Sequence, residues 1–418
     1  MTSPAPSSRS VRALDALAFF APDIQGGVGP FLVIFMAGTL AWDPQRIGSV
    51  MFVSALVGLA AQAPAGALID SVRHKPRWIA GAVALIALTL VAMANWPGYG
   101  VILAGQSLIG AAGTLVAPAL AATSLGMVGR AGLDSRIGRN AAITAAGTVL
   151  WALGTGAVSH LYGAHAMFFY ATAMAVPTIA AALLIRDRDI DPQLARGADA
   201  QDATPAAAGV RTARWYDRRL VVLLACAFLF HLANAAMLTL VAQKVSARAG
   251  ASAALWMSAG VIVTQLVTIP IGLAVGRWAP RLTRKPIFLV GLAVLPLRGL
   301  LYLLADSPAA LLALQVLDGV GAGIFGVMLT LMISDLTRGS GHFNFALGIG
   351  AACVGLGAAL SNLVAGTVAN AAGYGTAFVL LAGIAAAALA LFAIAMPETR
   401  RPGQATAAGA AALEGAAA

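Results

Sequence analysis

Twelve long apolar stretches, separated by short polar segments, run through the chain. Each is long enough to cross the hydrocarbon core of a bilayer as a helix, which takes about 20 residues. Charged residues gather between these stretches, as expected where burying charge in lipid is costly. The pattern predicts an all-α membrane protein with twelve transmembrane helices. The predicted spans are residues 12–40, 46–69, 78–96, 99–128, 140–162, 165–185, 220–242, 254–276, 286–305, 309–334, 343–370 and 374–396.

Composition and charge agree with this interpretation. Of 418 residues, 60% are hydrophobic and 10% are charged, whereas a soluble domain has roughly 25% charged residues. The net charge of +10 would suit a nucleic-acid partner, but its distribution does not. With the N-terminus inside, 22 of the 26 Lys and Arg lie in cytoplasmic segments, three in outer loops and one, Arg298, within a span. This bias predicts a multi-pass protein of the bacterial inner (cytoplasmic) membrane, with both termini cytoplasmic and no nucleic-acid partner.

The two halves of the chain resemble each other. A polar segment, residues 186–219, separates six predicted spans from six more. Matching residues recur 206–210 positions apart, and one insertion accounts for nearly all the drift. The matches include Pro64 with Pro270, Lys75 with Lys285, Gln106 with Gln315, Gly163 with Gly373, and Phe168 with Phe378. We therefore predict an N-terminal six-helix bundle (1–185), a cytoplasmic linker (186–219), a C-terminal six-helix bundle (220–396) and a cytoplasmic tail (397–418).

Two six-helix repeats joined by a cytoplasmic linker resemble the plan of the major facilitator superfamily over nearly the whole length. The resemblance implies a secondary transporter rather than an enzyme, working without a cofactor. It implies a substrate site near the membrane midplane, between two pseudo-symmetric bundles that rock about it, with spans 1, 4, 7 and 10 lining the cavity. Two stretches, 230–238 and 335–339, resemble a bacterial subgroup of this family.

The loop between the second and third spans carries part of a family motif. Gly66, Asp70 and Lys75 match it, whereas Ser71 and Arg73 do not. By resemblance, the matching residues serve the fold and conformational gating rather than substrate contact. Proton-coupled drug antiporters of the family often carry an Arg in span 4 and a Gly-Pro pair in span 5. Here Gln106 stands at the first place and residues 147–156 lack proline, so both departures weaken the antiporter interpretation.

Asp23 and His231 form a first candidate pair at membrane depth. Asp23 lies about 16 Å into span 1, at about 1.5 Å per residue, and His231 lies near the same depth in span 7. Their separation falls within the repeat offset, so we predict that they face one cavity from opposite halves. Gln25 and several glycines lie beside Asp23, and Asn234 follows His231 by one turn. We predict proton coupling for Asp23 and His231, and substrate binding for Gln25 and Asn234. The alternative is that Asp23 and His231 only satisfy each other or a backbone group.

Arg298 and Asp318 form a second candidate pair. They lie at similar depth in consecutive spans joined by the short segment 306–308, so we predict antiparallel neighbours and a salt bridge. Removing one partner of such a buried pair leaves a costly unpaired charge. Because span 10 is expected to line the cavity, the alternative is proton exchange by Asp318 and substrate contact by Arg298. Gln106 and Gln315 occupy matching positions, where their amides can bind substrate or hold helices together.

The function favoured by these residues is efflux of a small organic molecule by alternating access, coupled to proton entry. The candidates are acidic or neutral except for Arg298, which favours a cationic or neutral amphipathic substrate. Alternatives are proton-coupled uptake of a nutrient or siderophore, metal export through Asp23 and His231, and a sensor or scaffold without flux. The sequence shows no phosphate-binding loop, zinc-ligand spacing or nucleophile elbow. Expected partners are the lipid bilayer, protons and the small molecule, and we expect a monomer.

Overall fold

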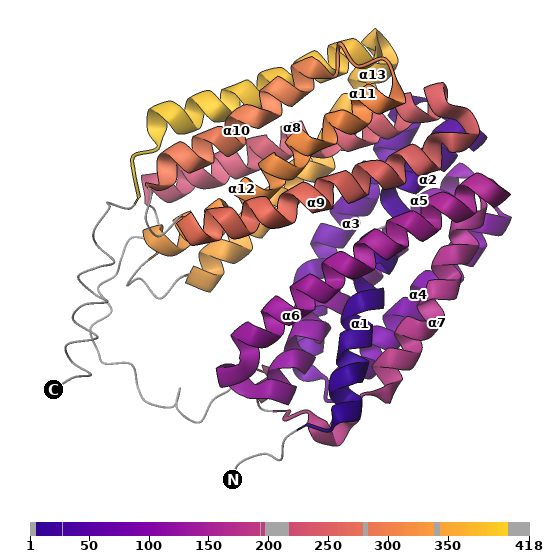
Figure 1. Ribbon diagram of the computed structural model, residues 1–418, viewed down its shortest axis with the longest axis vertical. Helices are drawn as coiled ribbons and strands as arrows, with labels where there is room; N and C mark the ends of the chain where they lie inside the picture. Colours follow the sequence, from indigo (N-terminus) through magenta and orange to yellow (C-terminus); the bar gives the residue numbers. More distant parts are fainter. Residues whose placement is uncertain are drawn as a thin grey trace. The chain divides into compact units, whose positions relative to one another are not determined.

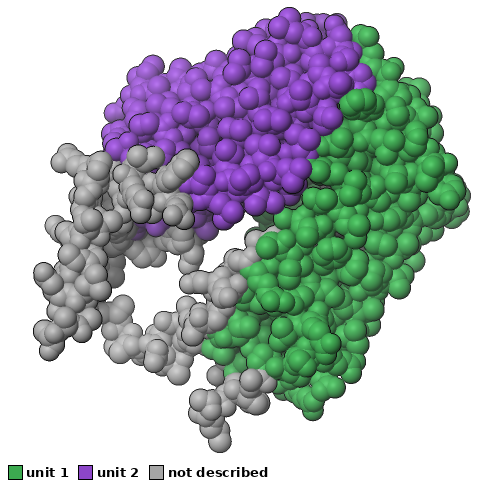
Figure 2. Space-filling view, in the orientation of Figure 1, with its two compact units in different colours: residues 1–208, 241–262 green, residues 209–240, 263–418 purple. Residues whose placement is uncertain are grey.

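The computed structural model describes residues 6–26, 28–192, 194–196, 217–278, 283–337 and 343–399, which are almost entirely helical (Figure 1). The side chains of Asp23, Gln25 and Asp70 lie outside the described part of the chain, as do most of the predicted linker and tail. The chain divides into two compact units. One comprises residues 1–208 and 241–262, and the other comprises residues 209–240 and 263–418 (Figure 2).

The first unit contains the helices of the N-terminal half. α1 (Ser8–Gly26), α2 (Val28–Ile34) and the π-helix η1 (Phe35–Thr39) cover the first predicted span. They are followed by α3 (Pro44–Ser71), α4 (Lys75–Asn95), α5 (Tyr99–Gly113), α6 (Val116–Tyr162), α7 (Ala166–Leu184) and the 3-10 helices η2 (Asp187–Asp189) and η3 (Leu194–Arg196). The end of α8 (Arg218–Ala249), the 3-10 helix η4 (Gly250–Ser252) and the start of α9 (Ala253–Trp278) also belong to this unit.

The second unit contains the rest of α8 and α9. It adds α10 (Arg284–Leu301), α11 (Pro308–Ala313), α12 (Gln315–Leu336) and α13 (Phe343–Ala395), with α10 packed against both α12 and α13. The compact units thus differ from a division at the linker, because residues 241–262 pack with the N-terminal half. The predicted bundle boundaries stay a prediction.

Helix starts follow local sequence signals. Asp43 precedes α3, and its carboxylate accepts a hydrogen bond from the backbone N–H of Arg46 at 2.8 Å, with Pro44 at the first helical position. Ser307 precedes α11 and accepts a hydrogen bond from the backbone N–H of Ala310 at 3.1 Å, with Pro308 at the first helical position. Both starts combine a side-chain oxygen that accepts from a backbone N–H with a proline, which has no backbone N–H to satisfy. This combination is common at the beginning of helices.

Eight helical ranges of the described residues are long and apolar enough to cross a membrane. Two of them, 218–276 and 346–395, each contain two predicted spans, so the eight ranges account for ten. The other two predicted spans correspond to α1, α2 and η1, and to α10. α10 has 18 residues and includes Arg284, Lys285 and Arg298, which lowers its mean hydropathy.

The internal repeat is visible in the backbone. Gly163, which ends α6, has φ 89° and ψ 158°, and Gly373, at the bend within α13, has φ 83° and ψ 164°. Positive φ values are strained for residues with a Cβ, so glycine is required at both turns. Phe168 and Phe378 follow at the same distance, and both side chains are fully buried. Matching residues of the two halves therefore adopt matching conformations.

Candidate functional site

A buried cation lies at the centre of the candidate site. Arg298, in the last turn of α10, is only 3% exposed. Its guanidinium forms an ion pair with Asp318 of α12 and donates a hydrogen bond to the side-chain oxygen of Asn234 of α8 at 2.5 Å. The ion pair predicted from the sequence is therefore present. One arginine ties three helices of the second unit together.

The rest of the guanidinium contacts weaker partners. Its carbon lies 5.8 Å from the ring centroid of Tyr302, one helical turn further on, which is within cation–π range. Nη2 also lies 3.3 Å from the sulfur of Met237. Arg298 Nε is buried and has no hydrogen-bond partner within the described part of the chain. Since a guanidinium has five donors, Asp318 and Asn234 do not satisfy all of them.

Gln315 takes part in the same cluster through Tyr302. Its side-chain amide is buried and donates to the hydroxyl oxygen of Tyr302 at 3.3 Å. Of the two roles open to Gln315 from the sequence, the structure shows a contact between helices. The matching residue, Gln106 in α5, is half-buried, and its buried Oε1 has no hydrogen-bond partner among the residues that the structure describes. The two matching glutamines are therefore used differently.

A small cavity of about 10 Å³ lies beside the ion pair. Its lining comprises Phe230, Asn234, Val294, Leu295, Arg298, Leu317, Asp318, Gly321 and Ala322. This volume is close to the minimum that holds one water molecule, so it is far too small for an organic substrate. The side chain of Asp318 is 20% exposed and that of Arg298 only 4%. The carboxylate is thus the accessible partner of the pair.

His231 lies in α8, about one helical turn before Asn234, and its ring contacts two aromatic side chains. Its ring lies 4.8 Å from the ring of Phe325 and 5.3 Å from that of Phe230, both in edge-to-face geometry. Its Nδ1 lies 3.2 Å from the carbonyl oxygen of Ala227. The backbone contact is the one foreseen as an alternative to a functional role. The predicted pairing with Asp23 falls on a side chain outside the described residues, and the same holds for Gln25.

The predicted gating residues lie at the end of α3 and the start of α4. The buried Nζ of Lys75 donates to the carbonyl oxygens of Ile69 at 2.7 Å and Val72 at 3.2 Å, so it caps the C-terminal end of α3. Among the described residues, no atom lies within 4 Å of a Cβ added at Gly66, so the predicted close helix approach is not seen there. The side chain of Asp70 is outside the described residues.

A charged cluster in the first unit was not singled out from the sequence. Arg136 of α6, only 5% exposed, lies 2.7 Å from the carboxylate of Asp15 of α1, and Arg139 contacts the same carboxylate at 2.6 Å. Both arginines fall in a segment predicted as a cytoplasmic loop, so their position in the sequence gives no indication that Arg136 is buried. Helical spacing is the available signal, since the segment that follows the break at Gly129 was predicted as a loop but is helical.

Comparison with known proteins identifies the family. The model of the family described as "Major Facilitator Superfamily" matches residues 14–296 and 249–416. The chain belongs to the major facilitator superfamily. It is therefore a multi-pass membrane protein of a transporter family, and the predicted fold class is confirmed. Within the described residues, no group of three or more His, Cys, Asp and Glu side chains is placed to hold a metal ion.

Similar proteins agree with this assignment. Two proteins of Mycobacterium tuberculosis strains, each called an uncharacterized MFS-type transporter, are 41% identical over 392 residues, which cover 94% of this chain and 94% of theirs. A solved structure of the nucleoside transporter NupG has a TM-score of 0.74 at 15% identity and covers 93% of this chain and 99% of that one. A bacterial homologue of the human drug peptide transporters has a TM-score of 0.67 at 15% identity, covering 93% and 97%. At such low identity, these two structures show the shared fold.

Proposed function

We propose that this protein is a proton-coupled secondary transporter that exports a small cationic or neutral amphipathic molecule by alternating access. The observation that carries the proposal is the Arg298–Asp318–Asn234 cluster, in which a buried cation depends on a partly exposed carboxylate. A partly exposed carboxylate can exchange a proton with its surroundings, which a fully buried one cannot do. We assign the coupling proton to Asp318, with Asp23 and His231 as further coupling candidates.

Competition for one carboxylate explains how the coupling works. A proton that binds Asp318 removes the negative charge that stabilises Arg298, and leaves the guanidinium with Asn234 and the ring of Tyr302. A buried charge that loses its partner is strongly destabilised, so the helices that carry these residues favour a different packing. Loss of the proton restores the negative charge of Asp318, and only then does the carboxylate attract a cationic substrate, so the proton and the substrate compete for one group. Proton and substrate thus bind alternately.

Export of a cationic substrate needs a source of energy. The membrane potential draws a cation toward a negative interior by about 2.3 kcal/mol per charge per 100 mV. Export of such a molecule must be driven, and proton entry supplies the driving force. Uptake of a nutrient or siderophore, metal export and a sensor without flux remain the alternatives. Residues proposed to contact the substrate are Asn234, Gln106, Gln25, Arg298 and Gln315.

Transport measurements on purified protein in proteoliposomes test the proposal. Cationic and neutral amphipathic compounds are first screened by thermal shift, and the hits are used for counterflow. We expect Asp318→Asn to keep exchange of a neutral substrate, to weaken exchange of a cationic one that needs the carboxylate, and to lose accumulation driven by a pH gradient, because an amide cannot carry the proton. Intact gradient-driven accumulation in Asp318→Asn would exclude this residue as the coupling site, and Asp23→Asn would then be measured in the same way.

Two controls separate coupling from folding. Asp318→Asn leaves Arg298 without its anionic partner, so the thermal midpoint of each variant is measured beside its transport. The double variant Arg298→Gln, Asp318→Asn removes both charges and is expected to fold but not to accumulate substrate against a pH gradient. If no compound is exchanged by the wild-type protein, transport itself is rejected in favour of a sensor or scaffold.

A further inference from the structure

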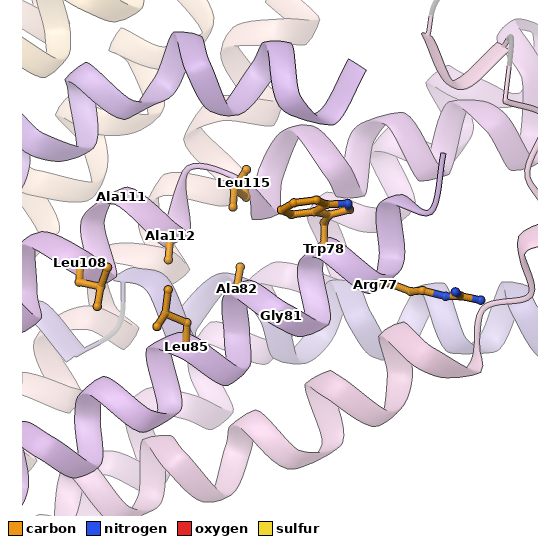
Figure 3. A pocket seen from close by; sticks show the side chains of 9 residues that line it. All are labelled: Arg77, Trp78, Gly81, Ala82, Leu85, Leu108, Ala111, Ala112 and Leu115. Carbon is orange, nitrogen blue, oxygen red and sulfur yellow. The ribbon is translucent and has the colours of Figure 1, made fainter. Parts of the chain in front are cut away.

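An apolar groove runs along the surface of the first unit. It has a volume of about 510 Å³ and lies between α4 and the line formed by α5 and the start of α6 (Figure 3). This volume falls within the range of about 300–1,000 Å³ that is typical of small-molecule sites. Its lining comprises Arg77, Trp78, Gly81, Ala82 and Leu85 of α4, with Leu108, Ala111, Ala112 and Leu115 opposite.

Small residues make the groove. Gly81 and Ala82 of α4 face Ala111 and Ala112 of α5, so the two helices present little side-chain volume at this level. A Cβ added at Gly81 would meet no atom within 4 Å, which shows that the space beside it is open. The larger side chains of Leu85 and Leu108 stand at one end, and Trp78 lies beside Leu115 at the other (Figure 3). The result is an elongated hollow with aliphatic walls.

Polar groups occur only at the end of the groove that holds Trp78 and Arg77. Arg77 extends from the first turn of α4, away from the aliphatic walls (Figure 3), and its side chain is 63% exposed. One of its nitrogens lies 2.9 Å from the carboxylate of Asp187, which also lies 2.8 Å from the ring of His74. Because guanidinium has five donors and Asp187 engages one nitrogen, Arg77 can bind a further anion. Trp78 combines an apolar ring with an N–H donor, as is typical of side chains at the membrane–water interface.

A ligand with an apolar tail and an anionic head matches this arrangement. We propose that the groove binds one acyl chain of an anionic phospholipid, whose phosphate lies against Arg77 at the first turn of α4. The positive end of the α4 dipole favours the same phosphate. The distribution of Lys and Arg predicts that this end of α4 faces the cytoplasm, where basic sites between helices attract anionic lipids.

Fluorescence quenching of Trp78 tests the proposal without any transport measurement. The protein is reconstituted in phosphatidylcholine vesicles that contain a small fraction of brominated phosphatidylglycerol or, in parallel, brominated phosphatidylcholine. The chain has seven Trp, so the Trp78 signal is taken as the difference from a Trp78→Phe variant. We expect phosphatidylglycerol to quench Trp78 about fivefold more effectively than phosphatidylcholine, as one basic side chain near a membrane surface would give.

Matched variants assign the effect to the head and tail of the lipid. Arg77→Gln is expected to abolish the preference, while Arg46→Gln keeps it; Arg46 is 62% exposed and also paired with an aspartate, Asp43. Gly81→Leu fills the groove and is expected to remove the preference, while Gly383→Leu keeps it, because Gly383 is also an exposed helical glycine with no atom within 4 Å of an added Cβ.

Three results would overturn the proposal. Equal quenching by the two lipids would mean that no anionic head is recognised. A preference that survives Arg77→Gln or Gly81→Leu would place the lipid elsewhere. Absence of any lipid quenching at Trp78, together with cross-linking of two protein copies through a cysteine at position 78, would show that a second copy covers the groove. None of these results bears on proton coupling at Asp318, so the two proposals fail separately.

Discussion

The contacts of Arg298 show which interactions of a single residue can be predicted from the sequence. Its pairing with Asp318 follows from equal depth in two consecutive spans and a short connection, both of which can be counted along the chain. The bond to Asn234 does not follow, because α8 and α10 are distant in sequence and their rotation about their own axes is set by packing. For Gln315, the sequence allowed a role in holding helices together but did not identify Tyr302 as its partner.

The stability of this cluster gives a prediction at the residue scale. Arg298→Met and Asp318→Leu are each expected to lower the stability of the protein by about 3–5 kcal/mol, since each leaves a buried group without its partner. The double variant is expected to recover much of this loss, because no charge stays unpaired. Thermal unfolding in detergent measures all three. Additive losses would show that the two residues do not act as a pair.

The exposed ion pair of Arg46 and Asp43 is the control for the variants of Arg298 and Asp318. Its side chains are 62% and 44% exposed, and such surface pairs contribute about 0–1 kcal/mol. Arg46→Met is therefore expected to change the thermal midpoint little. A large loss there would mean that the assay responds to any removed charge rather than to buried ones.

At the scale of helices, the sequence predicts the presence of each helix better than the residues at which it begins and ends. The apolar runs identify the spans, and the non-helical Gly129 in α6 and Gly373 in α13 break these ranges near the predicted ends of the fourth and eleventh spans. The extent differs at residues 130–139, which were predicted as a loop and are helical. A charged helix that leaves the membrane satisfies its own backbone hydrogen bonds, so polarity alone does not end it. The chain has 46 glycines, and only four of the described ones have positive φ. Composition cannot tell which of them form the turns.

Close helix contacts repeat in the two halves. A Cβ added at Gly147 of α6 would collide with the carbonyl oxygen of Phe19 of α1, and one added at Gly357 of α13 would collide with that of Phe228 of α8. The glycines lie 210 positions apart and the phenylalanines 209, which matches the repeat. Because backbone rather than a flexible side chain lies opposite each glycine, neither contact can relax easily. These contacts are the small-residue packing typical of membrane helices.

The contact at Gly357 gives a prediction at the element scale. Gly357→Ala is expected to lower stability by about 1–3 kcal/mol, because overpacking forces α8 and α13 apart. Gly348→Ala, in the same helix, adds a methyl group to open space and is expected to be neutral or stabilising by up to about 1 kcal/mol through helix propensity. Thermal midpoints in detergent measure both. Equal shifts in the two variants would contradict the proposed close contact.

At the scale of the whole molecule, the informative feature is the membership of residues 241–262 in the first unit. Ser246 of α8 donates a hydrogen bond to the carbonyl oxygen of Ile34 at 3.4 Å, and the hydroxyl of Ser258 of α9 donates to that of Ala152 at 2.6 Å. The sequence assigns this segment to the second repeat. Under the proposed alternating access, this packing belongs to one conformation, which no pattern in a single sequence can select. In the proposed cycle of alternating access, these contacts must break.

A reversible disulfide tests whether the contacts between residues 241–262 and the N-terminal helices break during transport. The structure places Ser246 Cβ 4.0 Å from an ideal Cβ built on Gly38, within the usual range of about 3.5–4.5 Å for a disulfide. In a background of Cys226→Ala and Cys353→Ala, which removes both native thiols, the pair Gly38→Cys and Ser246→Cys is expected to cross-link on oxidation. Cross-linked protein should lose both gradient-driven transport and exchange, because the helices can no longer separate, and dithiothreitol should restore both. Each single cysteine variant, oxidised in the same way, is expected to keep its activity. Full transport by protein shown to be cross-linked would mean that residues 241–262 stay with the N-terminal helices throughout the cycle, and that the pathway opens elsewhere.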